Sequence, residues 1–391
     1  MLTLKPPRLL TLLLGAIALT ACAGQLEPPP AAAVQPRSAN ATSAPMIVPI
    51  SAPSSKPTVP APTVQPSPTA AVVAAATSAP TSAPNPTADP ITGAPGLARG
   101  ALTRRPFMVM IDNHPDAYPQ TGLDHAAVVF EALAEFGVTR FMALYAPGIT
   151  SDAPQIGPVR STRLYFAQWA TGFHPLYVHA GGSPQGLALV ESTDQLINVD
   201  ALRRDGGAYF ARSSDREAPH NLYISSADLE HVAADRGVGD FAHPEVGFLF
   251  KTDTPEAQRP ASEHLTYFFI YKEDNAGWEY DPKTNGYLRL RRDNPARDAA
   301  TGKQLWTKNV VVIEVVEAKI AGDEKGRIEQ EVIGTGPARV FMDGVERAAT
   351  WRKADAAAPL RFYDASGDEI KLNAGPVWIV ALPSLDHLTV E

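Results

Sequence analysis

Short apolar runs separated by polar turns dominate the chain from residue 105 onward, and they predict a fold rich in β-strands. The first run, Phe107–Ile111, ends in Asp112 and Asn113. Polar residues at the carboxyl end of a buried strand are where α/β proteins usually bind their ligands. We therefore expect the end of this strand to contribute to any functional site.

Residues 126–145 fit two patterns. Apolar residues at 126, 129, 130, 133 and 136 would form one face of a helix, whereas alternation places Glu131, Leu133 and Glu135 on one face of a strand. Gly137, followed at once by β-rich residues, favours a hairpin, although a helix stays possible. In the hairpin, Glu131 or Glu135 could pair with Arg140, because carboxylates among apolar strand residues need such a partner.

The stretch around the Gly181-Gly182 pair predicts a strand, a tight turn and a helix. Ser183 stands where a helix N-cap belongs, and Pro184 stands where a first-turn proline belongs. Such a turn leaves backbone N–H groups beside His179, which suit an anion, a carboxylate or a developing oxyanion. A capped turn without any chemistry is the alternative.

Two other loops also lead into predicted helices. Arg160 and Arg163 lie near a helix start at about residue 161, where positive charge opposes the helix dipole. We therefore expect the arginines to have an anionic partner, in the protein or in a ligand. The alternative is that they are simply solvated, which for Arg163 alone would be acceptable. His220 and Asn221 lie in a loop before a helix that begins near Ser225.

The last third of the chain predicts mostly antiparallel β-structure. Turn pairs at Asn285-Gly286, Asp343-Gly344 and Ser366-Gly367 lie between apolar runs and predict hairpins, with a final strand over 377–380. Repeated hairpins favour a sandwich or barrel-like sheet. We expect Trp351 and Trp378 to pack in the core or between domains rather than to bind a sugar.

These patterns predict two domains of ordinary size. The N-terminal domain, residues 104–251, is expected to be α/β or α+β. The C-terminal domain, residues 252–391, is expected to be mainly antiparallel β.

Residues 1–22 have the pattern of a secretory signal. Lys5 and Arg8 precede the apolar run Leu9–Leu19, which is too short for a membrane-spanning helix. The segment Leu19-Thr-Ala-Cys22 resembles the lipobox of bacterial lipoproteins, where cleavage leaves a lipidated cysteine. Cys22 is the only cysteine of the chain, which excludes a disulfide within it. We therefore expect an extracytoplasmic protein anchored to the cell membrane through Cys22.

Residues 23–103 are rich in Pro, Ala, Ser and Thr and contain almost no aromatic residues. Such a segment cannot bury enough apolar surface to offset its ordering entropy. We expect a disordered, extended stalk between the anchor and the folded region.

The charge of the folded region narrows the choice of partner. Five basic and two acidic residues in the first 100 leave residues 101–391 with a formal net charge of −11, against −8 for the whole chain. An acidic surface of this kind argues against nucleic acid as a partner.

The candidate site residues gather in the N-terminal domain. The ligand-binding candidates are Asn113, Arg140, Arg160, His179, Gly181, Gly182, Ser183, His220 and Asn221. The weak catalytic candidates are Asp112, Glu131, Ser183 and His220. We expect Arg140, Arg160, His179 and His220 to converge beside the Gly181-Gly182 turn.

Two kinds of chemistry find little support. The chain has no His-x-x-x-His or His-Glu-x-x-His motif and no cysteine left after lipidation, so we expect no metal and no cofactor. A serine hydrolase could combine Ser183, His179 or His220, and Asp112, with the turn amides as oxyanion hole. However, an N-cap serine already uses its oxygen, and Gly-x-Ser-x-Gly is absent.

Several motifs together resemble the YerB-like family of bacterial lipoproteins, a family of two domains without an assigned biochemical function. They are Arg105-Pro with Met110-Ile-Asp-Asn113, Glu131-Ala-Leu-Ala-Glu135 with Thr139-Arg140, Ile156-Gly-Pro-Val-Arg-Ser161, Val178-His-Ala-Gly-Gly-Ser-Pro184 and Pro219-His-Asn-Leu-Tyr223. The resemblance implies an extracytoplasmic lipoprotein and no particular activity. Phe136 departs from the Glu-Gly-Gly expected in much of the family, which affects only the turn.

We favour a binding role, in which arginines and turn amides hold an anionic or glycan ligand of the cell envelope, or a partner protein. The first alternative is a hydrolase or transferase acting on a wall polymer, with Asp112, Glu131 or His220 as acid or base. The second alternative is a polar cluster that only joins the two domains.

Overall fold

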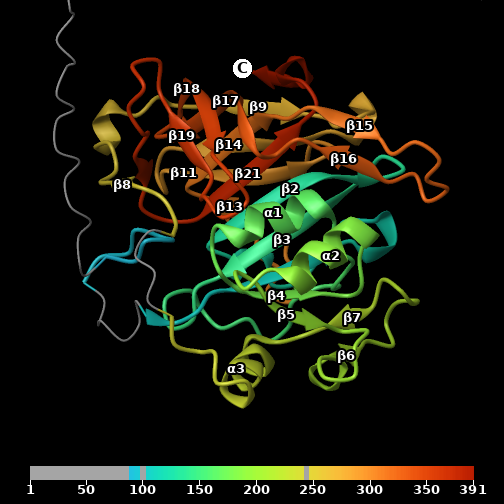
Figure 1. Cartoon of the computed structure of the whole chain (residues 1–391). Helices are drawn as coiled ribbons and strands as arrows, with labels where there is room; N and C mark the ends of the chain where they lie inside the picture. Colours follow the sequence, from blue (N-terminus) through green and yellow to red (C-terminus); the bar gives the residue numbers. More distant parts are fainter. Residues whose placement is uncertain (1–87, 97–102, 242–245) are drawn as a thin grey trace, which may run out of the picture. The chain divides into compact units, whose positions relative to one another are not determined.

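The structure is a computed structural model that describes residues 88–96, 103–241 and 246–391 (Figure 1). The predicted signal peptide, Cys22 and most of the predicted stalk lie outside these residues. The described part is mostly β, with three α-helices. None of the helices described is both long and apolar enough to cross a membrane.

A mixed ten-stranded sheet forms the centre of the fold. Its strands, in spatial order, are β19 (Arg361–Tyr363), β18 (Val345–Lys353), β17 (Gly334–Met342), β14 (Asn309–Glu314), β21 (Val377–Leu382), β2 (Val128–Glu135), β3 (Val138–Tyr145), β1 (Phe107–Asp112), β4 (Leu176–His179) and β5 (Ile197–Asp200). The strand β21 runs parallel to both β14 and β2. Strands from both sides of the expected boundary at residue 252 therefore share this sheet, and the division into two domains stays a prediction.

A second, antiparallel sheet packs against the first. Its strands are β12 (Asn294–Pro295), β11 (Gly286–Arg291), β10 (Ala276–Asp281), β9 (His264–Tyr267) and β22 (Leu388–Val390), with β13 (Trp306–Thr307) beside β11. The remaining strands form three pairs: β15 (Glu317–Lys319) with β16 (Ile328–Gln330), β20 (Leu372–Asn373) with β8 (Phe250–Lys251), and β6 (Ala211–Arg212) with β7 (Leu222–Tyr223).

Residues 126–145 form the hairpin β2-β3, so the helical alternative is wrong. Phe136 and Gly137 both have positive φ, 53° and 82°, as a tight hairpin turn requires. A β-bulge interrupts the pairing between Leu133 and Glu135. Because one extra residue reverses the facing of the residues after it, Glu135 does not share the face of Glu131 and Leu133, contrary to the expectation.

The three helices begin close to where the sequence predicts. They are α1 (Leu164–Thr171), α2 (Pro184–Ser192) and α3 (Ser226–Asp235). The Ser183 hydroxyl accepts the Gly186 N–H at 3.2 Å and caps α2. Ser225 and Asp228 form a reciprocal capping box at the start of α3. Local capping chemistry therefore fixes two of the three helix starts.

The predicted hairpins after residue 260 have mixed outcomes. Those at Asn285-Gly286 and Asp343-Gly344 are confirmed, with positive φ at Asn285 and Asp343. The hairpin predicted over 360–382 is wrong beyond its turn. After the turn that follows β19, an isolated bridge between Tyr363 and Glu369 stands in place of the expected second strand. The strand β20 then pairs with β8, and β21 enters the middle of the main sheet.

Two apolar clusters cover the two faces of the main sheet. Helices α1 and α2 lie side by side on one face, as Figure 1 shows, and Trp169 of α1 stacks on Phe130 with ring centroids 5.3 Å apart. The second sheet covers the other face, where Trp278 meets Trp378 at 5.1 Å. Trp351 and Trp378 are buried, as predicted.

Residues 88–96 belong to the folded part, although their composition assigned them to the stalk. Ile91 is buried in the core. The Phe248 N–H donates to the Pro90 carbonyl at 2.9 Å, and the Gly375 N–H donates to the Thr92 carbonyl at 2.7 Å. The stalk prediction for 23–103 therefore extends too far toward the C-terminus.

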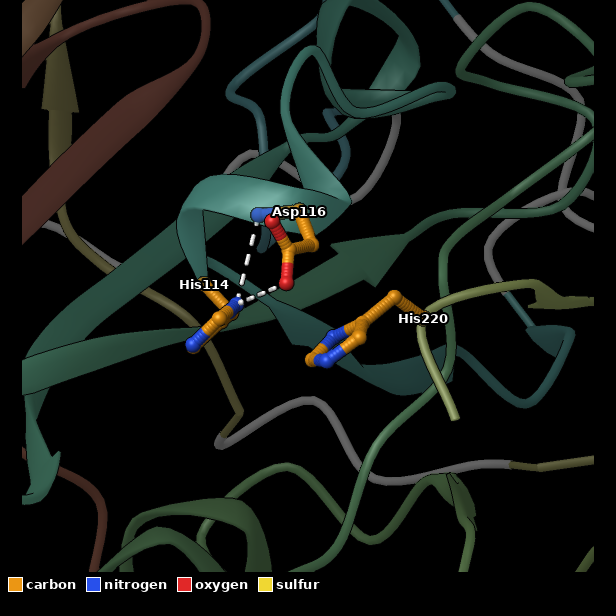
Figure 2. A group of neighbouring side chains, drawn as sticks. All are labelled: His114, Asp116 and His220. Carbon is orange, nitrogen blue, oxygen red and sulfur yellow. Dashed lines mark hydrogen bonds and ion pairs between the residues drawn. The ribbon is translucent and has the colours of Figure 1, made fainter. Parts of the chain in front are cut away.

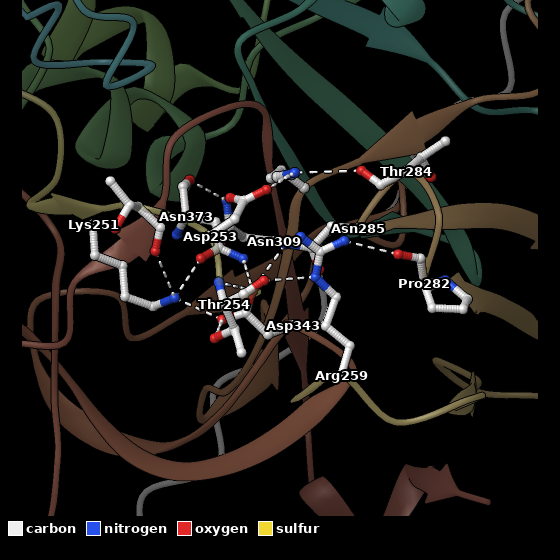
Figure 3. Close-up of polar contacts among 12 residues, drawn as sticks. Lys251, Asp253, Thr254, Arg259, Pro282, Thr284, Asn285, Asn309, Asp343 and Asn373 are labelled. Carbon is white, nitrogen blue, oxygen red and sulfur yellow. Dashed lines mark hydrogen bonds and ion pairs between the residues drawn. The ribbon is translucent and has the colours of Figure 1, made fainter. Parts of the chain in front are cut away.

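A buried carboxylate in the Asp343 turn connects the Asn285 turn with the strand pair β8-β20 (Figure 3). Asp343 accepts hydrogen bonds from the Lys251 ammonium at 2.6 Å, from Asn285 at 2.9 Å and from Asn373 at 2.8 Å, and two more from Thr254. Burial alone would raise the pKa of Asp343, but these donors outweigh it and hold the pKa well below its ordinary value. The ionised form of Asp343 thus stabilises the folded state.

We predict that Asp343→Asn destabilises the protein by about 2 kcal/mol near neutral pH, because it removes the charge that five donors surround. Asparagine tolerates the positive φ of this position, so the backbone should be unaffected. Since the depressed pKa stabilises only above the ordinary carboxyl pKa, the wild-type advantage should disappear as the pH falls below about 4. Urea unfolding across this pH range measures it. The exposed Asp386→Asn is the control, and an equal loss in both variants would contradict the prediction.

Candidate functional site

Polar residues end three neighbouring parallel strands. Asp112, His179 and Asp200 are the last residues of β1, β4 and β5, which pair in parallel in that order. Their carboxyl ends therefore meet at one edge of the sheet, the usual position of ligands in parallel sheets. This edge is the region that the sequence predicted for the site.

Asp112 is the centre of one group at this edge. Its carboxylate is buried and lies 2.9 Å from the Arg160 guanidinium and 2.8 Å from His220 Nδ1. The His114 N–H donates to its second oxygen at 3.1 Å. The His114 ring stacks on His220 at 4.5 Å, beside the exposed Asp116 (Figure 2). Three of the candidate residues, Asp112, Arg160 and His220, thus come together in one group.

At the glycine turn after β4, side chains of the protein itself occupy the predicted anion position. The Gly181 N–H donates to the Asp200 carboxylate at 2.8 Å. His179 is completely buried, with Nδ1 at 2.9 Å from the Gly181 carbonyl and Nε2 at 3.1 Å from Asn198. Burial lowers the pKa of His179, so the ring is neutral near pH 7. The predicted anion position therefore holds an internal carboxylate.

Gly182 and Ser183 have structural roles in the same turn. A Cβ on Gly182 would lie 2.6 Å from the Thr162 methyl group, so this glycine permits close packing. Ser183 is buried, its N–H donates to the Thr162 carbonyl, and its hydroxyl caps α2. The serine hydrolase alternative therefore lacks an accessible nucleophile.

Arg140 and Arg163 pair with Glu135 rather than with a ligand. Glu135 lies 2.9 Å from Arg140 and 2.5 Å from Arg163, and Arg140 also donates to the Ser161 carbonyl. Burial would raise the pKa of Glu135, but the two guanidinium groups lower it overall. The expected partner of Arg163 is thus a protein carboxylate, and the hairpin contact between Glu135 and Arg140 is present.

Glu131 lies between the two sheets and is closed off from solvent. It accepts hydrogen bonds from Arg289 at 2.8 and 3.0 Å, from the Tyr267 hydroxyl at 2.8 Å and from the Trp378 indole at 3.1 Å. Burial by itself lowers the pKa of Arg289, but Glu131 and Tyr267 raise it overall. Glu131 and Arg289 are both buried and pair with each other, although both also line the cavity described below.

The predicted convergence of four basic residues beside the turn is therefore wrong. Arg160 and His220 share Asp112, whereas Arg140 belongs to the Glu135 group and His179 to the Asp200 group. Buried charges take the partner that tertiary packing brings, and spacing in the sequence does not determine it.

The two candidate asparagines also differ in role. Asn221 uses its amide to close its own loop, donating to Ser213 and Arg216 carbonyls and accepting from Arg212. Asn113 bonds Thr139 and Gln120 and lines a cavity.

This cavity, of about 110 Å³, opens between the β1 edge and the second sheet, and we call it the β1–β11 groove. Its polar and aromatic lining includes Asn113, Tyr118, Tyr271, Asn275 and Arg291. The Arg291 guanidinium lies 4.4 Å from the centre of the Tyr118 ring. Within the described part of the chain, no carboxylate lies within 4.0 Å of Arg291.

Sequence reasoning missed most of the groove and two of the five residues of the Asp112 group. His114, Asp116 and Tyr118 follow the β1 strand in a loop that was interpreted only as extended by its prolines. Their position directly after a strand ending in Asp112 is the signal that could have identified them. Arg291 carries no such local signal, because Tyr118 is 173 positions away along the chain.

We predict that Glu131→Gln and Arg289→Met each destabilise the protein by about 3 to 5 kcal/mol, because each leaves a buried charge without its partner. The double variant, Glu131→Gln with Arg289→Met, should cost clearly less than the two single losses together. Urea unfolding of the three variants measures the coupling. Strictly additive losses would contradict a direct ion-pair role.

Comparisons with known proteins agree with this architecture. Residues 91–239 match the N-terminal domain of the family described as "Protein of unknown function (DUF3048)", and residues 266–379 match its C-terminal domain. The Bacillus subtilis (strain 168) protein named "Putative lipoprotein YerB" is 30% identical over 296 residues, which are 74% of this chain and 84% of that protein.

A solved structure shows the same fold. The crystal structure of YerB protein from Bacillus subtilis is similar with a TM-score of 0.68 and 27% identity, over 78% of this chain and 99% of that one. The YerB-like resemblance in the motifs is thus confirmed. The two matched regions cover more than half of the sequence, and the chain belongs to the DUF3048 family.

Proposed function

We propose that the protein is an extracytoplasmic, lipid-anchored protein that binds an acidic glycan of the cell envelope in the β1–β11 groove. The observation that carries the proposal is Arg291, a partly buried cation stacked on Tyr118 and without an ion-pair partner among the described residues. Burial lowers the pKa of Arg291 and outweighs Tyr118, Asp274 and Glu131 nearby, which raise it, while no direct ion pair compensates the charge among the described residues. A carboxylate on the ligand would supply that compensation.

The other groove residues suit a polyhydroxylated ligand. Tyr271 is 56% exposed and offers a flat apolar face. Asn113 contributes amide groups, and Asn275 Oδ1 is buried without a hydrogen-bond partner in the described structure. An aromatic face with a few directed polar groups is the usual composition of a small-ligand site. The Asn275 acceptor could receive a sugar hydroxyl once its side chain turns toward the groove.

The anchor is proposed from the sequence and from the relative. Cys22 closes a lipobox-like segment, and the similar Bacillus subtilis protein is named a lipoprotein. The long segment rich in proline would separate the groove from the membrane surface and give it access to wall polymers.

We predict that the full chain, solubilised in detergent, binds soluble acidic wall-glycan fragments, and that Arg291→Ala weakens binding at least tenfold by removing the cation. Calorimetric titration with such fragments and with neutral glycan fragments measures both affinity and charge preference. Tyr271→Ala should weaken binding of both classes, because the apolar face serves any sugar.

Arg352→Ala is the matched control for that experiment. Arg352 also lies over a tyrosine, 4.2 Å from the Tyr363 ring, and lines a separate cavity of about 630 Å³. Arg352→Ala should bind like the wild type. If Arg352→Ala lost binding while Arg291→Ala kept it, the β1–β11 groove would be the wrong site.

A second candidate function is hydrolysis or transfer on the same polymer. The observation in its favour is the 2.8 Å contact between Asp112 and His220 Nδ1, the arrangement that orients a histidine as general base. Analysis of the glycan fragments after incubation separates the two functions. Shortened fragments that disappear with His220→Gln would establish catalysis, whereas intact fragments support binding.

We predict that Cys22→Ala abolishes incorporation of labelled fatty acid and leaves a heavier, unprocessed chain, because Cys22 is the only thiol available for lipidation. Mass spectrometry of the membrane fraction measures both effects. Thr20→Ser is the control, since it keeps a small residue before the cysteine. Fatty acid incorporation that persists in Cys22→Ala would contradict the anchor.

A further inference from the structure

We propose that His114, Asp116 and His220 bind a divalent transition-metal ion, with Zn²⁺ as the representative. One ligand atom from each residue lies within 4.8 Å of the other two. Figure 2 shows the three side chains grouped beside the β1 edge, with the Asp116 carboxylate directed at His114. Two imidazoles and one carboxylate are a donor set that suits zinc and related metals rather than calcium or magnesium.

His220 is already oriented as a ligand. The Asp112 carboxylate lies 2.8 Å from His220 Nδ1, and a carboxylate beside an arginine can only accept. Nδ1 therefore carries the proton, and Nε2 keeps its lone pair, for which the described structure holds no partner. A carboxylate behind a histidine is the usual support of a metal ligand, because it fixes the ring and its tautomer.

The support is itself rigid. Asp112 is 1% exposed, and the Arg160 guanidinium and the His114 N–H both hold its carboxylate. Arg216 joins the two loops that carry the ligands, since its guanidinium donates to the Ala117 and Pro119 carbonyls. The backbone segments of His114 and His220 therefore stay together, although 106 positions separate them.

The other two ligands are more exposed, although His114 Nδ1 also accepts the Asp116 N–H at 3.2 Å and caps the turn. The His114 side chain is 39% exposed and that of Asp116 is 72% exposed, on the short turn Pro115–Ala117. Ligand atoms of a tetrahedral zinc site lie about 3.4 Å apart, as bonds of about 2.1 Å require. Binding thus needs the His114 ring to turn out of its stack on His220 and the carboxylate to approach by about an ångström. Three protein ligands leave the fourth position for water or an oxygen of a ligand.

This site is independent of the groove residues that carry the proposed function. His114 and His220 do not line the β1–β11 groove, although Asn113 and Pro115, the neighbours of His114 along the chain, do. Absence of short metal motifs led the sequence prediction to exclude a metal. The ligands instead come from a strand end and from a loop that folds back onto it.

The test is a titration of the untagged full chain in detergent, stripped with a chelator, with Zn²⁺ by calorimetry and with Co²⁺ by visible absorption. We expect one ion per chain. His114→Ala and His220→Ala should each weaken binding at least tenfold, and the cobalt absorption of a tetrahedral site should disappear. Asp112→Asn should weaken binding about 10- to 100-fold, because it removes the support of His220 and no ligand.

His125→Ala is the matched control. His125 lies 3.4 Å from Asp124, so this pair offers one histidine and one carboxylate without a second histidine. Wild-type affinity in His125→Ala, with loss in His114→Ala, supports the site. No saturable binding to the wild type, or equal binding by His114→Ala, overturns it. Since His114 lies on an exposed turn, circular dichroism should show this variant folded, which keeps the result decisive.

Discussion

The buried ion pair between Glu131 and Arg289 holds the two sheets of this fold against each other. An isolated charge in this position would cost several kcal/mol, so both partners must be in place before the sheets can close. Trp278 and Trp378 both pack against the guanidinium, with ring centres 4.9 and 5.0 Å from it. The β1–β11 groove opens beside these residues, so its walls depend on the same contact.

The pair also explains why strands from distant parts of the sequence share one sheet. Trp378 belongs to β21, which runs parallel to β2 and places its indole N–H on the Glu131 carboxylate. A parallel strand is not joined to its neighbour by a local hairpin. Its position in the sheet is therefore set by contacts between residues distant in the sequence. The last strand of the main sheet along the chain thereby enters between the two halves of the sequence. Cooperative unfolding of both halves is the expected consequence.

Local structure was predictable wherever one residue type determines the backbone. Gly137 with alternating residues identified the β2-β3 hairpin, Ser183 and Pro184 identified the start of α2, and Asp343-Gly344 identified a turn. Faces and partners were not predictable in the same way. The bulge after Leu133 turned Glu135 toward Arg140, and no feature of the sequence announced that extra residue.

Short sequence motifs do not reveal which polar residues pair with each other inside the protein. Pairing inside the protein satisfies Glu131, Glu135 and Asp200, so these carboxylates stabilise the fold and offer nothing to a ligand.

Some of the groups that the chain leaves unsatisfied lie at the edge proposed as the functional site. Within the described residues they include the Arg291 guanidinium, the Asn275 carbonyl oxygen and His220 Nε2. Neighbouring residues hold each of these groups in place but do not provide its missing ion-pair or hydrogen-bond partner. An unpaired group costs the folded protein stability, and a ligand or metal that completes it recovers that free energy as affinity.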